Sequence, residues 1–344
     1  MTLNSHRFEV FSGYGAISEV PNYGPRTPSS FQPDRVKAVC AKPFYKSTSA
    51  GLSLLLGSRV HAYVDLTKPK IVFLLDFTAV MAFLVATRGI NLLNLVSVIV
   101  AGTFASGGAG ALNCYLDRDI DQSMGRTSQR PIPRGKVSPF NALVFGSILV
   151  ATGVGVSLWL LSLWASLFIF LGAAIYVGFY TKWLKRRTTL NIVLGGSAGS
   201  CAPLAGWAAA TGNVGVMAPW LMALLVFVWT PSHFWSLALR ASKDYAKAGI
   251  PMLPVVVGDK KAAQYIALNT FLLVPSSLIF VPLGTFGIIY LAIAGLLGLG
   301  MIIVDLKLAF NPTKAQAWTA FKFSSPYLAI VFLAMVLDYW IPLH

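Results

Sequence analysis

The stretch LLNLVSVIVAGTFASGGAGALNCYLDRDID, from Leu92 to Asp121, decides the fold class, because an apolar run ends abruptly in charged residues. Residues 92–114 carry no charge and can cross a hydrocarbon core of roughly 30 Å, which takes about 20 helical residues. Similar runs recur along the 344 residues, of which 56% are hydrophobic and only 11% charged. Lipid leaves the backbone no hydrogen-bond partner outside helices or closed barrels, and the runs lack the short alternating segments of a barrel. The sequence therefore predicts an all-α, polytopic membrane protein.

The positive charge is distributed on one side of the predicted membrane spans. Of the 27 Lys and Arg, six precede residue 51, 20 lie in segments on one side and only Arg88 lies on the other. This asymmetry predicts a cytoplasmic N-terminus and an outside C-terminus, and it explains the net charge of +15 without nucleic-acid binding. We expect about nine transmembrane helices in a bundle around a cavity open to the cytoplasmic side. The predicted spans are 70–88, 92–114, 138–160, 164–182, 189–211, 216–239, 263–283, 285–306 and 320–342.

Residues 1–60 differ from the rest of the chain. They are rich in Ser, Gly and Pro and contain no apolar core of a secretory signal peptide, so we expect a disordered N-terminal extension before a membrane domain at 61–344. An organelle transit peptide is the alternative, although Glu9, Glu19 and Asp34 argue against it.

The membrane is the plasma membrane if the source is prokaryotic and the mitochondrial inner membrane if it is organellar. The three cysteines are scattered and indicate neither zinc nor disulfides.

Asn113, Asp117 and Asp121 follow one another at intervals of four residues, which places them on one face of a helix. Asp119 lies about 200° from Asp117 and faces away. An amide oxygen and two carboxylates suit Mg²⁺, whose coordination is usually completed by waters and substrate phosphates. A DxxxD pattern alone is more often a solvated acidic helix end. The basic residues that follow it make a diphosphate site the better interpretation.

The basic residues lie in two segments on the same side of the membrane. Guanidinium groups bind phosphate oxygens, although ordinary anchoring of a cytoplasmic loop is the alternative for the second cluster. Gly195 and Gly199 form a GxxxG pattern that allows helices to approach closely and brings the second segment beside the aspartates. An anion held there, with an apolar tail in the bundle, describes a prenyl diphosphate. The candidate phosphate ligands are Arg126, Arg130, Lys182, Lys185, Arg186 and Asn191.

The chain resembles the intramembrane aromatic prenyltransferase superfamily from about Tyr63 to the C-terminus. NCYLDRDID contains its NxxxDxxxD motif, and YVDLTKPKI, YTKWLKRRT…NIVLGG, TPSHFW and DYAKAGIPMLPVV resemble the heme O synthase branch. The resemblance implies a lipid-embedded enzyme that transfers a farnesyl group from farnesyl diphosphate to a vinyl group of protoheme. It also implies a downstream partner, either a heme A synthase or a terminal oxidase.

The resemblance also assigns residues. It implies that Asn113, Asp117 and Asp121 hold Mg²⁺ on the diphosphate, and that Asp244 joins the catalytic and metal-binding set as the remnant of a second aspartate motif. Ala248 stands where a full DxxxD would have its second aspartate. The diphosphate oxygens are assigned to Arg126, Arg130, Lys182, Lys185 and Arg186.

His233 lies inside the sixth predicted span, two residues after Pro231. It either repairs backbone groups freed by the proline or contacts heme, and Trp229 and Trp235 are further candidates for heme contact. Core packing explains the two tryptophans equally well. Asp76 lies at a similar predicted depth in the first span, so we expect it to pair with His233 across helices.

Two other functions fit parts of the pattern. A transporter would explain the intramembrane Asp76 and His233, but it would usually hold its substrate near the midplane, whereas the charges here gather at one face. Within the enzyme class, the alternative is prenylation of a quinone or chlorophyll precursor.

Overall fold

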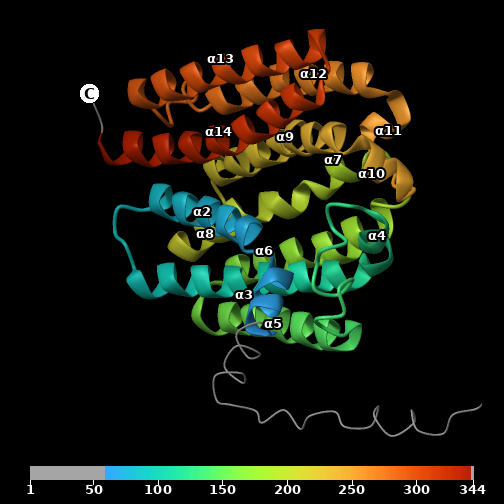
Figure 1. Cartoon of the computed structure of the whole chain (residues 1–344). Coiled ribbons are helices and arrows are strands. Elements are labelled where there is room, and N and C mark those ends of the chain that lie inside the picture. Colours follow the sequence, from blue (N-terminus) through green and yellow to red (C-terminus); the bar gives the residue numbers. More distant parts are fainter. Residues whose placement is uncertain (1–58, 342–344) are drawn as a thin grey trace, which may run out of the picture. The chain divides into compact units, whose positions relative to one another are not determined.

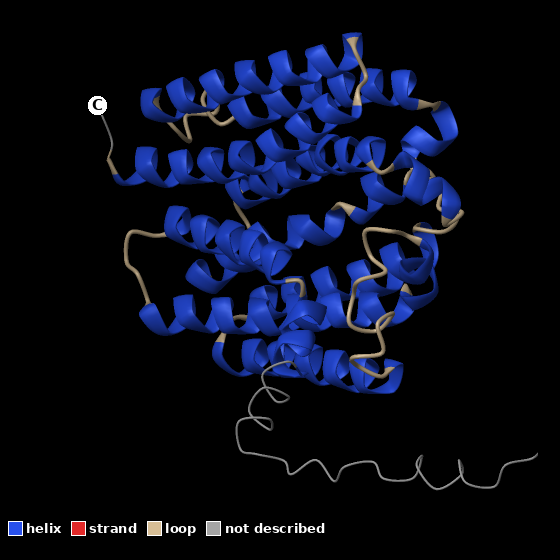
Figure 2. Ribbon diagram, viewed as in Figure 1, coloured by secondary structure: helices blue, strands red, loops and turns tan. Residues whose placement is uncertain are grey.

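The computed structural model describes residues 59–341, and the described chain is helical with no strand (Figure 2). This confirms the predicted all-α class. Residues 59–67 are helical and lead into the first long helix. The segment 1–58, which holds most of the predicted N-terminal extension, lies outside the described residues. The helices are α2 (Pro69–Ala86), α3 (Leu92–Leu116), α4 (Arg118–Ser123), α5 (Pro139–Leu160), α6 (Leu163–Ala174), the π-helix η2 (Ile175–Leu184), α7 (Asn191–Gly195), α8 (Ser197–Thr211), α9 (Met217–Arg240), α10 (Ser242–Lys247), α11 (Leu253–Val257), α12 (Asp259–Leu278), α13 (Ile288–Phe310) and α14 (Lys314–Trp340).

Eight of the described helical segments are long and apolar enough to cross a membrane. They are α2, α3, α5, α6 with η2, α7 with α8, α9, α13 and α14. The ninth predicted span corresponds to α12, a helix of 20 residues. Its first turn contains Asp259, Lys260 and Lys261, which make it more polar than the other eight. The protein is an integral, multi-pass membrane protein, and about nine long helices form its bundle, as predicted.

The long helices lie side by side and run in the same general direction across the view (Figure 1). α3 packs on α5, α2 on α8, and α14 on both α9 and α13. The short helices α4, α10 and α11 gather at the right-hand end of the bundle in Figure 1. We call this end, where the charged segments between long helices lie, the polar end.

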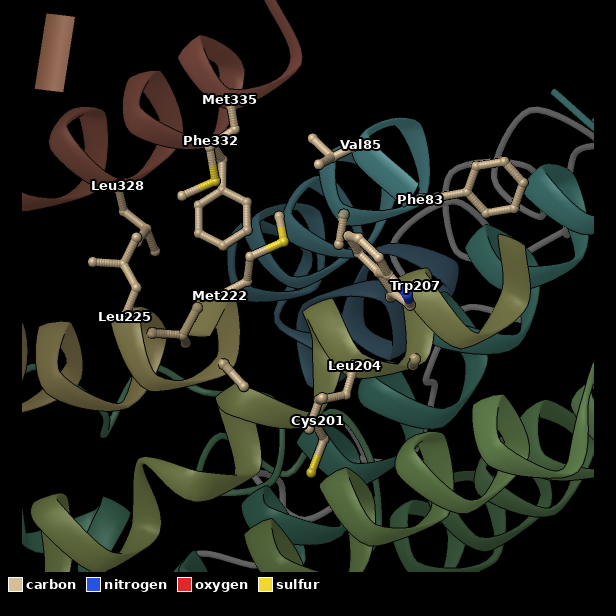
Figure 3. Packing of buried hydrophobic residues seen from close by; sticks show 14 of the residues in the cluster. Phe83, Val85, Cys201, Leu204, Trp207, Met222, Leu225, Leu328, Phe332 and Met335 are labelled. Carbon is tan, nitrogen blue, oxygen red and sulfur yellow. The ribbon is translucent and has the colours of Figure 1, made fainter. Parts of the chain in front are cut away.

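The interior between α2, α8, α9 and α14 is filled by apolar side chains (Figure 3). Phe83, Trp207, Met222 and Phe332 come from these four helices and are buried. In lipid the association of helices depends on close packing, for which small residues are suited. Gly206 of α8 shows this, because a Cβ there would lie 1.9 Å from the carbonyl oxygen of Ala79 on α2.

Candidate functional site

The acidic row, defined as Asn113, Asp117 and Asp121, is buried at the junction of α3 and α4. Asp117 separates the two helices and has φ −93° and ψ 6°. The four-residue hydrogen bonds nevertheless continue, from Asp117 N to Asn113 O at 2.9 Å and from Asp121 N to Asp117 O at 2.8 Å. The three side chains therefore keep the common face that their spacing predicts, and Asn113 Nδ2 donates to Asp117 Oδ2 at 2.9 Å.

Each carboxylate of the acidic row has a basic partner. Lys185, which directly follows η2, places its Nζ 2.5 Å from Asp117 Oδ2. Arg130 donates from Nη1 to both oxygens of Asp121, at 2.9 and 2.8 Å. Burial lowers the pKa of Arg130, but the neighbouring groups, Asp121 first among them, together raise it by more, so that the net shift is upward. The structure thus brings together two of the predicted phosphate ligands with two of the three predicted metal-binding carboxylates.

Lys68 also belongs to the site, although it was not among the predicted site residues. Its Nζ donates to Asn113 Oδ1 and, at 3.1 Å, to the hydroxyl of Tyr176. Its φ of 56° makes it the one described non-glycine residue with positive φ, a left-handed conformation that costs roughly 1–2 kcal/mol. Such strain is retained where surrounding structure holds it, often at functional sites. The Lys–Pro step before α2, within the motif YVDLTKPKI, was the available sequence signal.

The π-helix η2 positions the opposite wall of the acidic row. Thr181 Oγ1 accepts from Asn113 Nδ2 at 2.9 Å and donates to the Tyr176 carbonyl at 2.7 Å. A π-helix carries more residues per turn than an α-helix and changes which side chains share a face. In η2 this places Thr181 against α3, whereas Lys182 is exposed and makes no polar contact within residues 59–341.

Arg186 forms a second ion pair on the outside of the row. Its guanidinium binds both Asp119 oxygens at 2.7 Å and also donates to the Leu116 carbonyl at 3.1 Å. Asp119 faces away from the acidic row, as its position on the helix predicts, and its side chain is 61% exposed. The hydrogen bonds from Arg186 lower the pKa of Asp119 to about 2. Arg186 is therefore not among the groups that face the acidic row.

The segment after α4 contacts α10 through Arg126, which donates from Nη2 to the Tyr245 hydroxyl at 3.1 Å. Asp244 lies on the same side, since its Oδ1 is 4.0 Å from the position of a Cβ on Gly125. Across residues 59–341, no three Asp, Glu, His or Cys side chains converge as a metal site. The structure therefore does not place Asp244 together with both carboxylates of the acidic row.

Two of the candidate site residues have a buried oxygen without a hydrogen-bond partner. Asp117 Oδ1 is buried and has no hydrogen-bond partner, although an unsatisfied buried carboxylate oxygen is costly. Asn191 is also buried; its Nδ2 donates to the Thr188 carbonyl at 2.7 Å, while its Oδ1 lacks a partner. The oxygen donors of the acidic row match the preference of Mg²⁺ for few protein ligands and added phosphates. These residues fit a magnesium ion.

His233 and Asp76 do not form the predicted pair. The Thr103 hydroxyl donates to Asp76 Oδ2 at 2.6 Å, and His233 Nδ1 lies 2.6 Å from Ser324 Oγ. The prediction was wrong because Asp76 of α2 faces α3, whereas His233 of α9 faces α14. Equal depth along two helices does not place their side chains in contact.

The two predicted heme-contact tryptophans have different surroundings. Trp229 stacks on His233 with a centroid distance of 4.4 Å and donates from Nε1 to the Ser324 carbonyl at 2.7 Å. Trp235 instead packs in a buried cluster with Ile120 and Met124, and its Nε1 has no partner. Trp235 therefore packs with α4 and the residue that follows it, and it is not part of the His233 ring stack.

A family model described as the UbiA prenyltransferase family matches residues 75–334. The chain belongs to this family. It is 44% identical over 285 residues to the protoheme IX farnesyltransferase of Gloeobacter violaceus, an alignment that covers 82% of this chain and 93% of that protein. The predicted membership in the intramembrane prenyltransferases is thus confirmed.

Solved structures share the UbiA fold. A structure described as digeranylgeranylglyceryl phosphate synthase matches with a TM-score of 0.68 and 22% identity, over 82% of this chain and 98% of that chain. A UbiA homolog from Archaeoglobus fulgidus bound to GPP and Mg²⁺ matches with a TM-score of 0.59 and 18% identity, over 80% and 99%. At these identities the comparison establishes the fold alone.

Proposed function

We propose that this UbiA family member transfers a farnesyl group from farnesyl diphosphate to a vinyl group of protoheme, which gives heme O. The observation that carries the proposal is the acidic row, buried at the polar end and opposed by Lys68, Arg130 and Lys185. The substrate assignment is supported by the 44% identity with a protoheme IX farnesyltransferase over most of both chains. The densest polar groups lie at one end of the bundle, which favours an enzyme with an amphipathic substrate over a transporter with a midplane site.

Mg²⁺ would be held by the amide oxygen of Asn113 and the carboxylates of Asp117 and Asp121. When bound, it would supply Lewis-acid stabilisation of the negative charge on the departing diphosphate. Asp117 Oδ1 supports this assignment, because it is a buried carboxylate oxygen without a hydrogen-bond partner. Asp244 is assigned to the catalytic set by resemblance alone.

The basic side chains have two sets of partners in this proposal. Without substrate, Lys185 and Arg130 neutralise the two buried carboxylates. Diphosphate oxygens would offer these same cations charge-assisted hydrogen bonds, and release of the carboxylates would make their oxygens available as ligands. Lys68 would be a third cation for the diphosphate, because its Nζ could donate to a diphosphate oxygen in place of Asn113 Oδ1. Preorganised cations of this kind stabilise the charge that develops on a leaving group.

The chemical step breaks the bond between farnesyl C1 and the diphosphate oxygen and forms a carbon–carbon bond from C1 to the terminal vinyl carbon. The positive charge left on the neighbouring vinyl carbon is quenched by water, which adds a hydroxyl and releases a proton. The buried position of the acidic row would limit water access until that last step.

The polar end is assigned to the cytoplasmic side, which leaves the N-terminus cytoplasmic and the C-terminus outside. Support comes from the 20 Lys and Arg that share one side of the predicted spans. An interaction with a heme A synthase or a terminal oxidase stays a prediction.

The purified protein in phosphatidylcholine nanodiscs tests the reaction. Given farnesyl diphosphate, Mg²⁺ and protoheme, it should release diphosphate and form a farnesylated heme in equal amounts. Chelation of divalent cations should stop both products. Product formation on a quinone precursor in place of protoheme would overturn the substrate assignment but preserve the prenyl-transfer site.

A further inference from the structure

Four planar side chains stack along the contact between α9 and α14. His233 lies between Trp229 and Phe321, with both centroid distances 4.4 Å and interplanar angles of 21° and 29°. Phe321 in turn stacks on Trp318 at 5.2 Å and 16°. Trp318 lies in the second turn of α14, so the stack extends from the bundle interior to the polar end. Near-parallel stacked pairs of this kind are a preferred arrangement of planar side chains, and here they join α9 to α14.

Two cations share the ring at the end of the stack. The Arg240 guanidinium lies 4.3 Å from the Trp318 centroid, and Lys322 Nζ lies 5.8 Å from it. Both side chains are exposed, and neither belongs to the four ion pairs found in residues 59–341. Two like charges near one indole repel each other, so an anion that contacts both would be stabilised by both. A lipid headgroup or a carboxylate ligand would satisfy them.

The hydrogen bonds of Ser324 indicate which nitrogen of His233 carries the proton. Ser324 Oγ donates its single proton to the Phe321 carbonyl at 2.8 Å, so it accepts from His233 Nδ1 at 2.6 Å. The lone pair of the neutral imidazole is then on Nε2, which has no hydrogen-bond partner among the described residues. Trp229 and Phe321 stack on the ring and Ser324 holds its Nδ1, so Nε2 is the ring nitrogen that is left for a ligand. Metal-binding histidines have this arrangement, with the second nitrogen donating to a supporting acceptor.

We propose that Arg240 and Lys322, held against Trp318, bind the two propionate carboxylates of protoheme, while His233 Nε2 marks the position of its iron. This inference rests on the proposed protoheme substrate. Seven residues of α9 separate His233 from Arg240, or roughly 10 Å at 1.5 Å per residue. That separation is close to the distance from the iron of protoheme to the ends of its propionates. The carboxylates then stay at the polar end, where water solvates them, and the apolar macrocycle extends into the bundle.

The test compares two ligands and two double variants of the full-length protein in phosphatidylcholine nanodiscs. The ligands are protoheme and its dimethyl ester, which has the same ring and iron but no carboxylate charge. Absorbance titration gives each dissociation constant. Arg240→Gln with Lys322→Gln removes the proposed contacts, whereas Lys260→Gln with Lys261→Gln removes the same charge from exposed residues of α12. Thermal unfolding verifies that both variants are folded.

The proposal predicts that the first double variant binds protoheme roughly tenfold more weakly, whereas its affinity for the ester is unchanged. The control variant should bind both ligands as the unaltered protein does, and exchange of the two charges (Arg240→Lys with Lys322→Arg) should restore protoheme binding. Equal protoheme affinity in both double variants would overturn the carboxylate assignment and favour lipid headgroups as the partners. If the Gln variant does not fold, equal affinity of the unaltered protein for protoheme and its ester overturns the proposal. Absence of any protoheme binding by the unaltered protein would instead contradict the proposed function.

Discussion

Lys185 Nζ lies 2.5 Å from Asp117 Oδ2, whereas Asp117 Oδ1 is buried and has no partner. One oxygen of the same carboxylate is therefore compensated, and the other is free to bind a ligand. The pair therefore compensates the buried charge of Asp117 through Oδ2 and leaves Oδ1 available to a metal ion.

Loss of the Lys185 charge should destabilise the protein more than loss of the charge on Arg186, the next residue in the chain. Lys185→Gln leaves the Asp117 charge buried and uncompensated, which costs about 3–5 kcal/mol. Arg186→Gln breaks a pair whose side chains are 40% and 61% exposed, worth under about 1 kcal/mol. Reversible unfolding in mixed micelles measures both free energies of unfolding. Equal losses would show that burial of the Asp117 pair does not determine its contribution.

The ion pair between Asp119 and Arg186 should make the stability of the protein fall at low pH. The pKa of Asp119 is lowered to about 2 in the folded protein, against about 3.9 in an unfolded chain. The contribution of Asp119 to stability is therefore complete above pH ~4 and is lost as pH falls toward 2. Carboxyl NMR of labelled protein should show the Asp119 midpoint near the low value. In Arg186→Gln the midpoint should rise toward 3.9, and an unchanged midpoint would contradict the assigned cause.

Gly206→Ala should weaken the packing of α8 on α2. The added Cβ would lie 1.9 Å from the Ala79 carbonyl oxygen, so the helices must separate, and a loss of roughly 1–3 kcal/mol follows. Gly155→Ala in α5 is the matched control, because its Cβ meets no atom within 4 Å. That change should be neutral or stabilise the helix by up to about 1 kcal/mol. Thermal unfolding of both variants measures the difference. A Gly206→Ala protein as stable as the unaltered protein would contradict the close approach of α8 to α2.

Asp338, near the C-terminal end of α14, caps the start of the neighbouring helix α13. Its carboxylate accepts from the backbone amides of Gly287 at 2.6 Å and Tyr290 at 3.1 Å. Asp338→Ala should cost about 1–2 kcal/mol, as loss of a helix cap does, whereas Asp338→Asn keeps one acceptor oxygen and should cost less. Hydrogen exchange at Tyr290 measures the local effect. Faster exchange in Ala than in Asn is expected, and equal exchange in the two variants would argue against a capping role.

The four-residue spacing predicted the acidic row correctly, since the i to i+4 geometry of a helix acts locally. The outward position of Asp119 follows from the same local geometry. The long spans could also be predicted, because each is a continuous apolar run in the sequence. α12 is less clear, because Asp259, Lys260 and Lys261 belong to its first turn and were predicted as part of the preceding loop.

Contacts between distant segments could not be predicted in this way. The place of Lys68 depends on a left-handed backbone before Pro69, and that of Thr181 depends on the π-helical geometry of η2. The Asp76–His233 pairing was wrong because depth along a helix contains no information about rotation or neighbours. The partners Thr103 and Ser324 lie on helices whose packing is set by the whole bundle.

The central claim is that the acidic row supports farnesyl transfer to protoheme, and heme extracted from cells that express the chain tests it most directly. Chromatography with mass detection should show a farnesylated, hydrated heme for the unaltered protein and for Asp119→Asn. In Asp121→Asn, which loses a buried carboxylate ligand but keeps its shape, the product should fall by about 100-fold or more, with the protein still present in the membrane. Unmodified heme alone from cells with the unaltered protein, or full product with Asp121→Asn, would contradict the account.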